Sequence, residues 1–252
     1  MRRFRAAAVV VAAAAALTGC GLADAIGLEV DTGSARSNGA SSEHGTNPLD
    51  NPDGTKPGLA PITSAEDKQE ARDLIEKLAT RGRGPKTGYS RDEYGYAWAD
   101  TATGVPLARN GCDTRNDILS RDGTNLRYRS GSHCVLESMT VYDPYTGTTI
   151  EWRKSDAAKV QIDHVVPLSY SWQMGASRWP KEKRVQIAND PLNLLSVDGS
   201  TNSAKGDSSP ASWLPPNRRI RCAYVVRFAQ VALKYGLPVT QPDKTAMLEQ
   251  CR

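Results

Sequence analysis

The chain has 252 residues, of which 32 are basic and 28 acidic, and its formal net charge is +4. This length is sufficient for one domain with a hydrophobic core, and the mild positive charge permits a polyanionic ligand without requiring one. No two of the five cysteines are separated by only two residues, which argues against a zinc knuckle.

Residues 1–19 have the pattern of a secretory signal peptide. A basic start at residues 1–5 precedes an apolar run at residues 6–17, which is too short to span a bilayer. The ending Leu17-Thr-Gly-Cys20 resembles a bacterial lipobox, so we expect Cys20 to carry a lipid that anchors an exported protein to the extracellular face of the membrane. The alternative is simple cleavage beside an incidental cysteine, which would leave the protein secreted.

Residues 20–63 contain many Gly, Ser, Asp, Asn and Pro residues and few large apolar ones. Such a segment buries too little apolar surface to offset the entropy of ordering, so the composition predicts a flexible tether. The folded domain is then expected over residues 64–252, with 27 basic and 22 acidic residues and a net charge of +5.

Four cysteines fall in this domain, an even number that indicates disulfide bonds in an oxidising compartment. They allow three pairings. We favour Cys112–Cys134 and Cys222–Cys251 because each closes a loop of moderate length within one region. Each bond is expected to stabilise the fold by about 2–4 kcal/mol.

The hydrophobic pattern predicts an α+β domain, a small β element packed with several helices. A capping sequence at residues 64–67 precedes a helix that ends near Gly82, residues 83–111 are expected to be mainly loops, and a short helix is expected at 114–119. A hairpin over residues 138–152 and a strand over 160–166, stopped by Pro167, form the predicted β element. The later helices are expected at residues 169–175, 181–188, 220–235 and 243–250.

The strongest chemical signal is a set of polar residues between positions 163 and 207. Its parts are Asp163-His164-Val-Val-Pro167, Asn193-Leu-Leu and Asn202-Ser-Ala-Lys205-Gly-Asp207. Hydrolysis of a phosphodiester needs a base for the attacking water and a cation at the phosphate. Histidine titrates near neutral pH, and Asp and Asn oxygens favour Mg²⁺ or Mn²⁺ over Zn²⁺. The pattern therefore predicts a metal-dependent phosphodiesterase.

These segments resemble the ββα-metal motif of HNH endonucleases, and more narrowly the exported actinobacterial HNH endonuclease family. The resemblance covers about Thr114 to Cys251, and the matching segments are residues 114–117, 143–147, 161–166, 188–195, 202–207 and 213–216. The resemblance implies that His164 is the general base, that Asp163 and Asn202 are metal ligands, and that Asn193 braces the loop and orients the base. Many relatives have histidine where Asn202 stands, and the asparagine favours Mg²⁺ over Zn²⁺ or Ni²⁺.

Other residues have two interpretations each. Lys205 either contacts a substrate phosphate or lies on a solvated face. Arg115 either contacts a second phosphate, with Asp117 orienting it, or forms a structural ion pair with Asp117. Trp172, Trp179 and Trp213 either stack on bases or pack in the core, and core packing is the favoured alternative.

The sequence thus predicts an exported, disulfide-stapled HNH endonuclease that uses Mg²⁺, or alternatively Mn²⁺, to hydrolyse DNA or RNA with His164 activating water. DNA is the favoured substrate. Because no dedicated base-reading element is evident, we expect largely non-specific cleavage. The alternative is a non-catalytic extracellular lipoprotein that binds nucleic acid.

Overall fold

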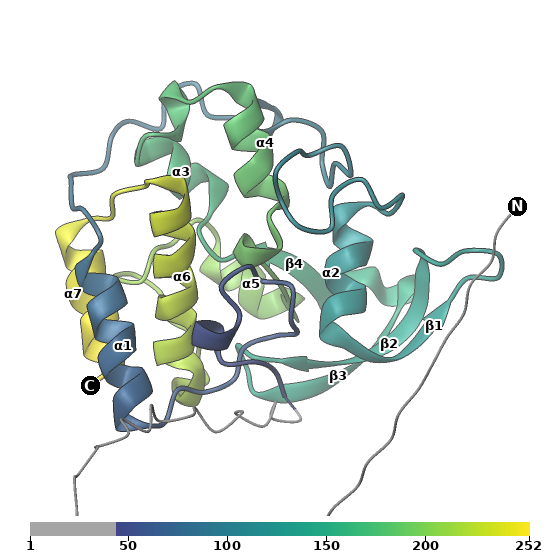
Figure 1. Cartoon of the computed structure of the whole chain (residues 1–252). Helices are drawn as coiled ribbons and strands as arrows, with labels where there is room; N and C mark the ends of the chain where they lie inside the picture. The colour runs from purple at the N-terminus through teal and green to yellow at the C-terminus, as the bar shows by residue number, and fades with distance from the viewer. Residues whose placement is uncertain (1–43) are drawn as a thin grey trace, which may run out of the picture. The chain divides into compact units, whose positions relative to one another are not determined.

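The computed structural model describes residues 44–252 and has an α+β fold (Figure 1). The predicted signal peptide, Cys20 and the first part of the predicted tether lie outside the described residues. The helices are α1 (Ala65–Glu76), α2 (Thr114–Asp122), α3 (Leu168–Gln173), α4 (Lys181–Asn189), α5 (Gly199–Lys205), α6 (Arg221–Tyr235) and α7 (Gln241–Gln250). The strands are β1 (Gly123–Tyr128), β2 (Leu136–Asp143), β3 (Thr148–Arg153), β4 (Val160–His164) and β5 (Leu194–Asp198). The predicted fold class is confirmed.

The first sheet is antiparallel, with strand order β1-β2-β3. The predicted hairpin is β2–β3, which pairs Asp143 with Thr148 at its closed end. The Asp143 carboxylate accepts hydrogen bonds from the backbone amides of Tyr145 and Thr146, which shapes the turn. Strand β1 was not predicted, because most of its side chains are exposed and its pairing with β2 contains register shifts.

The second sheet consists of β4 and β5, which pair antiparallel with Asp163 opposite Leu195 and His164 opposite Leu194. Helix α5 follows β5 directly, and the Asp198 carboxylate caps it by accepting from the Thr201 amide at 2.7 Å. The order β4–β5–α5 forms a ββα unit, with α3 and α4 inserted between the two strands. This arrangement is compatible with a ββα-type nuclease core.

Strand β5 separates two hydrophobic clusters. Leu195 and Val197 pack into the larger one, which helices α1, α3, α6 and α7 help to form. Leu194 packs into the smaller cluster, between α2 and the three-stranded sheet. Because both faces of β5 are buried, its sequence shows no alternation of apolar and polar residues. This explains why the apolar pattern did not predict the strand.

Helices α1, α6 and α7 lie side by side on one flank of the domain (Figure 1). Nearly every residue of α6 is buried, and Gly236 ends the helix with a positive φ of 64°. The Cys222–Cys251 bond joins the start of α6 to the end of α7, and the Cys112–Cys134 bond joins the residue before the α2 cap to the β1–β2 connection. Both favoured pairings are therefore confirmed.

The segment of residues 44–63 does not behave as the predicted tether. Leu59 and Ile62 are only 1% and 4% exposed and belong to the larger cluster. Gly54, whose φ is +74°, lies against the backbone of Leu192 so closely that a Cβ atom would come within 2.3 Å of it. The folded domain therefore starts no later than residue 44. Composition did not predict this because the segment has few apolar residues, and those few are buried against distant parts of the chain.

A buried ion pair between Arg121 and Asp122 fixes this segment. The Arg121 guanidinium donates to the backbone carbonyls of Gly54, Pro191 and Leu194. The Asp122 carboxylate accepts from the amides of Gly58 and Ser196. Burial alone would raise the pKa of Asp122, but Arg121 and these amide donors outweigh it and hold the pKa below its usual value.

No helix within residues 44–252 combines the length and the apolar character needed to cross a membrane.

Replacing Leu59 with Ala tests the packing of residues 44–63. A buried leucine truncated to alanine leaves a cavity, so the free energy of unfolding should fall by about 2–5 kcal/mol. Thr63→Ala, at an exposed position of the same segment, should change it by less than about 0.5 kcal/mol. Urea unfolding measures both changes. If Leu59→Ala lowers the free energy of unfolding no more than Thr63→Ala does, the segment does not support the fold.

The Asp122 carboxylate should make stability pH-dependent. Because its native pKa is lowered, its contribution is complete above the unfolded pKa of about 3.9 and is lost as the pH falls through the native pKa. Urea unfolding of the wild type and of Asp122→Asn should therefore give a large difference near neutral pH that shrinks in acid. A difference independent of pH would contradict this assignment.

Candidate active site

One cleft of about 290 Å³ contains most of the predicted site. Asp163 and His164 reach it from the end of β4, Asn202 from α5, and Asp207 from the turn after α5. The remaining polar lining residues are Ser169 at the start of α3 and Lys86, Tyr89 and Arg91 in the connection between α1 and α2. The tertiary structure thus brings together the predicted base and both predicted metal ligands.

Asp163 is 4% exposed and takes part in a buried hydrogen-bond network. The Lys205 ammonium donates to its Oδ1 at 2.8 Å and to its Oδ2 at 2.7 Å. The Tyr145 hydroxyl, from the β2–β3 turn, donates to Oδ2 at 2.5 Å. Burial and the nearby Asp163 charge raise the pKa of Tyr145 well above its usual value, so the hydroxyl keeps its proton.

Neither interpretation of Lys205 from the sequence is correct. Its side chain is buried, with the residue 1% exposed, instead of lying on a solvated face. Its Nζ also donates to the backbone carbonyl of His164 at 2.8 Å. With three acceptors around one ammonium, no N–H remains for a substrate phosphate. The lysine instead fixes the β4 end to the C-terminal end of α5.

His164 is also buried, and its partners differ from those of Asp163. Its Nε2 donates to the Ala188 carbonyl at 2.9 Å, so Nδ1 carries the lone pair of the neutral ring. The Trp98 ring stacks on the imidazole, with 5.8 Å between centroids and 7° between planes. Burial lowers the pKa of His164 to about 4; the Ala188 hydrogen bond opposes this change and the Arg91 charge adds to it. The imidazole is therefore uncharged at neutral pH.

Asn193 is fully buried and lies behind the cleft. Its Oδ1 accepts from the Val166 amide at 2.8 Å, and its Nδ2 donates to the Ile187 carbonyl at 3.0 Å. It thereby connects the loop after His164 to the end of α4, next to the Ala188 carbonyl that holds the imidazole. These bonds hold the residues that follow His164 against the end of α4.

Asn202 and Asp163 offer oxygen atoms suited to a hard divalent cation. The Asn202 Nδ2 donates to Gln161 Oε1 at 2.9 Å, whereas its Oδ1 accepts no hydrogen bond from residues 44–252. Asp163 Oδ1 accepts only from Lys205 within the same range, which leaves one lone pair. One carboxylate and one amide oxygen in a polar cleft fit Mg²⁺ that completes its coordination with water and phosphate. Because the Lys205 ammonium neutralises part of the Asp163 charge, Asp163 and Asn202 bind a cation more weakly when no phosphate adds further ligands.

Arg115 does not lie in this cleft. Its guanidinium lies over the Trp152 ring at 6.0 Å, and burial lowers its pKa. Asp117 instead accepts from the Asn110 side chain at 2.9 Å, and it forms no ion pair with Arg115. The predicted ion pair between Arg115 and Asp117 is therefore wrong, and a phosphate contact of Arg115 stays a prediction for a place outside this cleft. Trp172, Trp179 and Trp213 pack in or against the larger hydrophobic cluster, as the favoured alternative stated.

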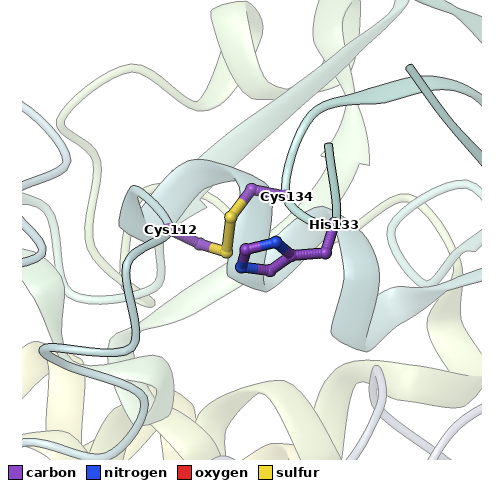
Figure 2. Close-up of side chains that lie close together, drawn as sticks. All are labelled: Cys112, His133 and Cys134. Carbon is purple, nitrogen blue, oxygen red and sulfur yellow. A yellow bond between two sulfur atoms is a disulfide. The ribbon is translucent and has the colours of Figure 1, made fainter. Parts of the chain in front are cut away.

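Cys112, His133 and Cys134 form a second group of potential metal ligands, beside the start of α2 (Figure 2). The two sulfur atoms are bonded to each other, which removes them as thiolate ligands. His133 alone does not make a metal site.

Sequence analysis missed the cleft residues that come from the predicted loop region. Lys86, Tyr89 and Arg91 line the cleft, and Trp98 covers the His164 ring, although all four precede residue 113. Trp98 adopts a positive φ of 57°, which is unusual for a residue with a side chain. No spacing pattern connects these residues to the motif at 163–207, so no signal in one sequence could have identified them.

Replacing Lys205 alone should lower the free energy of unfolding much more than replacing Lys205 and Asp163 together. Lys205→Met leaves the buried Asp163 carboxylate uncompensated, which should lower the free energy of unfolding by about 3–5 kcal/mol. Asp163→Asn combined with Lys205→Met should recover much of that loss, because no buried charge remains. Urea unfolding of both single variants and the double variant measures the coupling, and additive effects would contradict a structural ion pair.

Comparison with known proteins identifies the family to which this chain belongs. The family described as GmrSD restriction endonucleases, C-terminal domain, matches residues 113–250, more than half of the chain. An uncharacterized secreted protein of Arthroderma benhamiae is 40% identical over 186 residues, which cover 72% of this chain and 84% of that protein. This relative is fungal, so it does not support an actinobacterial origin. No solved structure matches the chain. The ββα unit lies inside the matched residues, and the chain belongs to the family of the GmrSD restriction endonuclease C-terminal domain.

Proposed function

We propose that this protein is an HNH-type, metal-dependent endonuclease that hydrolyses phosphodiester bonds of DNA. The observation that carries the proposal is the single cleft that unites Asp163, His164 and Asn202 around a ββα unit. Membership in a family of restriction endonuclease domains supports the same class of reaction.

In this proposal His164 is the general base. Its Nδ1 takes a proton from water as the oxygen of that water attacks phosphorus. The P–O3′ bond breaks and the departing 3′ oxygen takes a proton from solvent water, leaving 5′-phosphate and 3′-hydroxyl ends. The ring is uncharged at neutral pH, so Nδ1 can accept a proton, although burial lowers the pKa of the imidazole and makes it a weaker base than free histidine. Asn193 and the Ala188 carbonyl hold the ring in one orientation.

Asp163 and Asn202 would hold Mg²⁺, with Mn²⁺ as the alternative ion. When bound, the ion supplies Lewis-acid stabilisation of charge on the phosphate and on the leaving oxygen. Lys205 and Tyr145 keep the Asp163 carboxylate in place through its other lone pairs. Because the ammonium already neutralises part of the carboxylate charge, we expect the ion to bind more tightly once substrate phosphate adds ligands.

We further propose that the protein acts outside the cell. Two disulfide bonds are typical of proteins from oxidising compartments. The relative from Arthroderma benhamiae is named as secreted. The expected signal peptide at residues 1–19 agrees with export, and lipidation of Cys20 would anchor the protein to the membrane. Cleavage is expected to be largely independent of base sequence.

Plasmid cleavage tests the assigned base and ion. With Mg²⁺ the wild type should cut plasmid DNA, EDTA should abolish cutting, and added Mg²⁺ or Mn²⁺ should restore it. His164→Ala should reduce the rate by about 10²–10⁴-fold, whereas His133→Ala, at an exposed turn, should leave it unchanged.

Two outcomes would contradict the proposal. Undiminished cleavage by His164→Ala would remove His164 as the base. Stoichiometric DNA binding by the wild type that is indifferent to metal, with no cleavage under any divalent ion, would favour the non-catalytic binding protein.

A further inference from the structure

Two cations on the wall of the cleft have no role in the chemistry above. Lys86 and Arg91 are the only cationic residues that line the cleft within residues 44–252, and both precede the matched family domain. We infer that Arg91 and Lys86 form the phosphate-binding wall of the site, which holds the backbone of a nucleic-acid strand beside His164. This inference rests on the proposed function and assigns its substrate contacts.

The charge balance of the cleft supports this assignment. The negative charge of Asp163 is compensated by Lys205, and that of Asp207 by Lys86 at 2.7 Å. Arg91 is exposed and forms no hydrogen bond or ion pair with any residue of the described chain. The cleft thus has one uncompensated positive charge, on a residue that lines the same cleft as His164. A phosphodiester at the same place would compensate that charge.

The backbone beside Arg91 is firmly held. The next residues form a short 3₁₀ turn in which the buried Tyr94 hydroxyl donates to the Leu168 carbonyl at 2.8 Å. Arg184 donates to both the backbone carbonyl and the carboxylate of Glu93, at 2.8 Å and 3.0 Å. A guanidinium on a fixed backbone binds phosphate at less entropic cost than one on a mobile loop, and its planar donors match phosphate oxygens in pairs.

Lys86 is a weaker contact, because it must first leave Asp207. Both side chains of that pair are about half exposed, at 54% and 53%, and exposed ion pairs contribute little net stability. Asp207 also accepts from the Ser169 hydroxyl at 2.8 Å, so it keeps one partner when Lys86 moves to a phosphate. We therefore expect Arg91 to contribute more to substrate binding than Lys86.

Salt-dependent binding of a fluorescein-labelled DNA duplex tests the inference. The measurement uses fluorescence anisotropy over a series of NaCl concentrations, with His164→Ala as the common background so that the duplex is not cut. Adding Arg91→Ala should weaken binding by about tenfold and should reduce the slope of log K against log salt by about 0.9, the value for one phosphate contact. Lys86→Ala should produce a smaller loss of affinity.

Two control variants separate phosphate contact from other effects. Arg91→Lys should keep the salt slope, because it retains the charge. Arg129→Ala removes an exposed arginine that does not line the cleft and should change neither quantity. Thermal unfolding of each variant should match that of the background protein.

The outcomes distinguish this inference from the proposed function. If the wild type cuts DNA but Arg91→Ala binds with unchanged affinity and slope, the inference is overturned and the nuclease assignment remains. If the wild type does not cut DNA but Arg91→Ala shows the expected losses, the phosphate wall is supported in a binding protein. If the background protein binds no nucleic acid, the inference is overturned together with the proposed function.

Discussion

The buried ion pair between Asp163 and Lys205 is the interaction on which the site depends. It joins the end of β4 to the end of α5, and the Tyr145 hydroxyl connects the β2–β3 turn to the same carboxylate. Removing two charges from water is costly, and the cost is offset only when every donor and acceptor is paired. In this network the Lys205 ammonium and the Tyr145 hydroxyl each donate to buried acceptors, so the three elements are held in one relative position and the cleft keeps its shape.

Asp163 and His164 are adjacent on β4, but their side chains have different surroundings and therefore different chemical properties. The Asp163 carboxylate accepts hydrogen bonds from an ammonium and a hydroxyl, whereas His164 stays neutral because burial and Arg91 disfavour its protonated form. Asn193 contributes without reaching the cleft, by tying the loop after His164 to the end of α4. A neutral imidazole and a carboxylate that is hydrogen-bonded to an ammonium therefore lie side by side at the end of β4.

The cleft is formed by residues of the matched family domain together with residues that precede this domain in the chain. The family domain supplies Asp163, His164 and Asn202, and the preceding residues supply Lys86, Arg91 and the Trp98 ring. Residues 44–63 make no contribution to the cleft lining, but through Arg121 and Asp122 they are held against α2, β5 and the turn before β5. The contacts that stabilise the fold and the lining of the cleft thus extend beyond the boundaries of the matched family domain.

The sequence by itself determined the long amphipathic helix α6, the β2–β3 hairpin, the α+β class and the disulfide pairs, because periodicity, turn residues and loop lengths are local properties of a chain. It also identified His164, Asp163 and Asn202, because their spacing resembles a known motif. Only the tertiary structure decided the burial of Lys205, the order of residues 44–63, the position of strand β5 and the cations of the cleft. Each of these depends on partners far away in the chain, and burial, ion pairing and backbone contact are set by such partners and not by neighbouring residues.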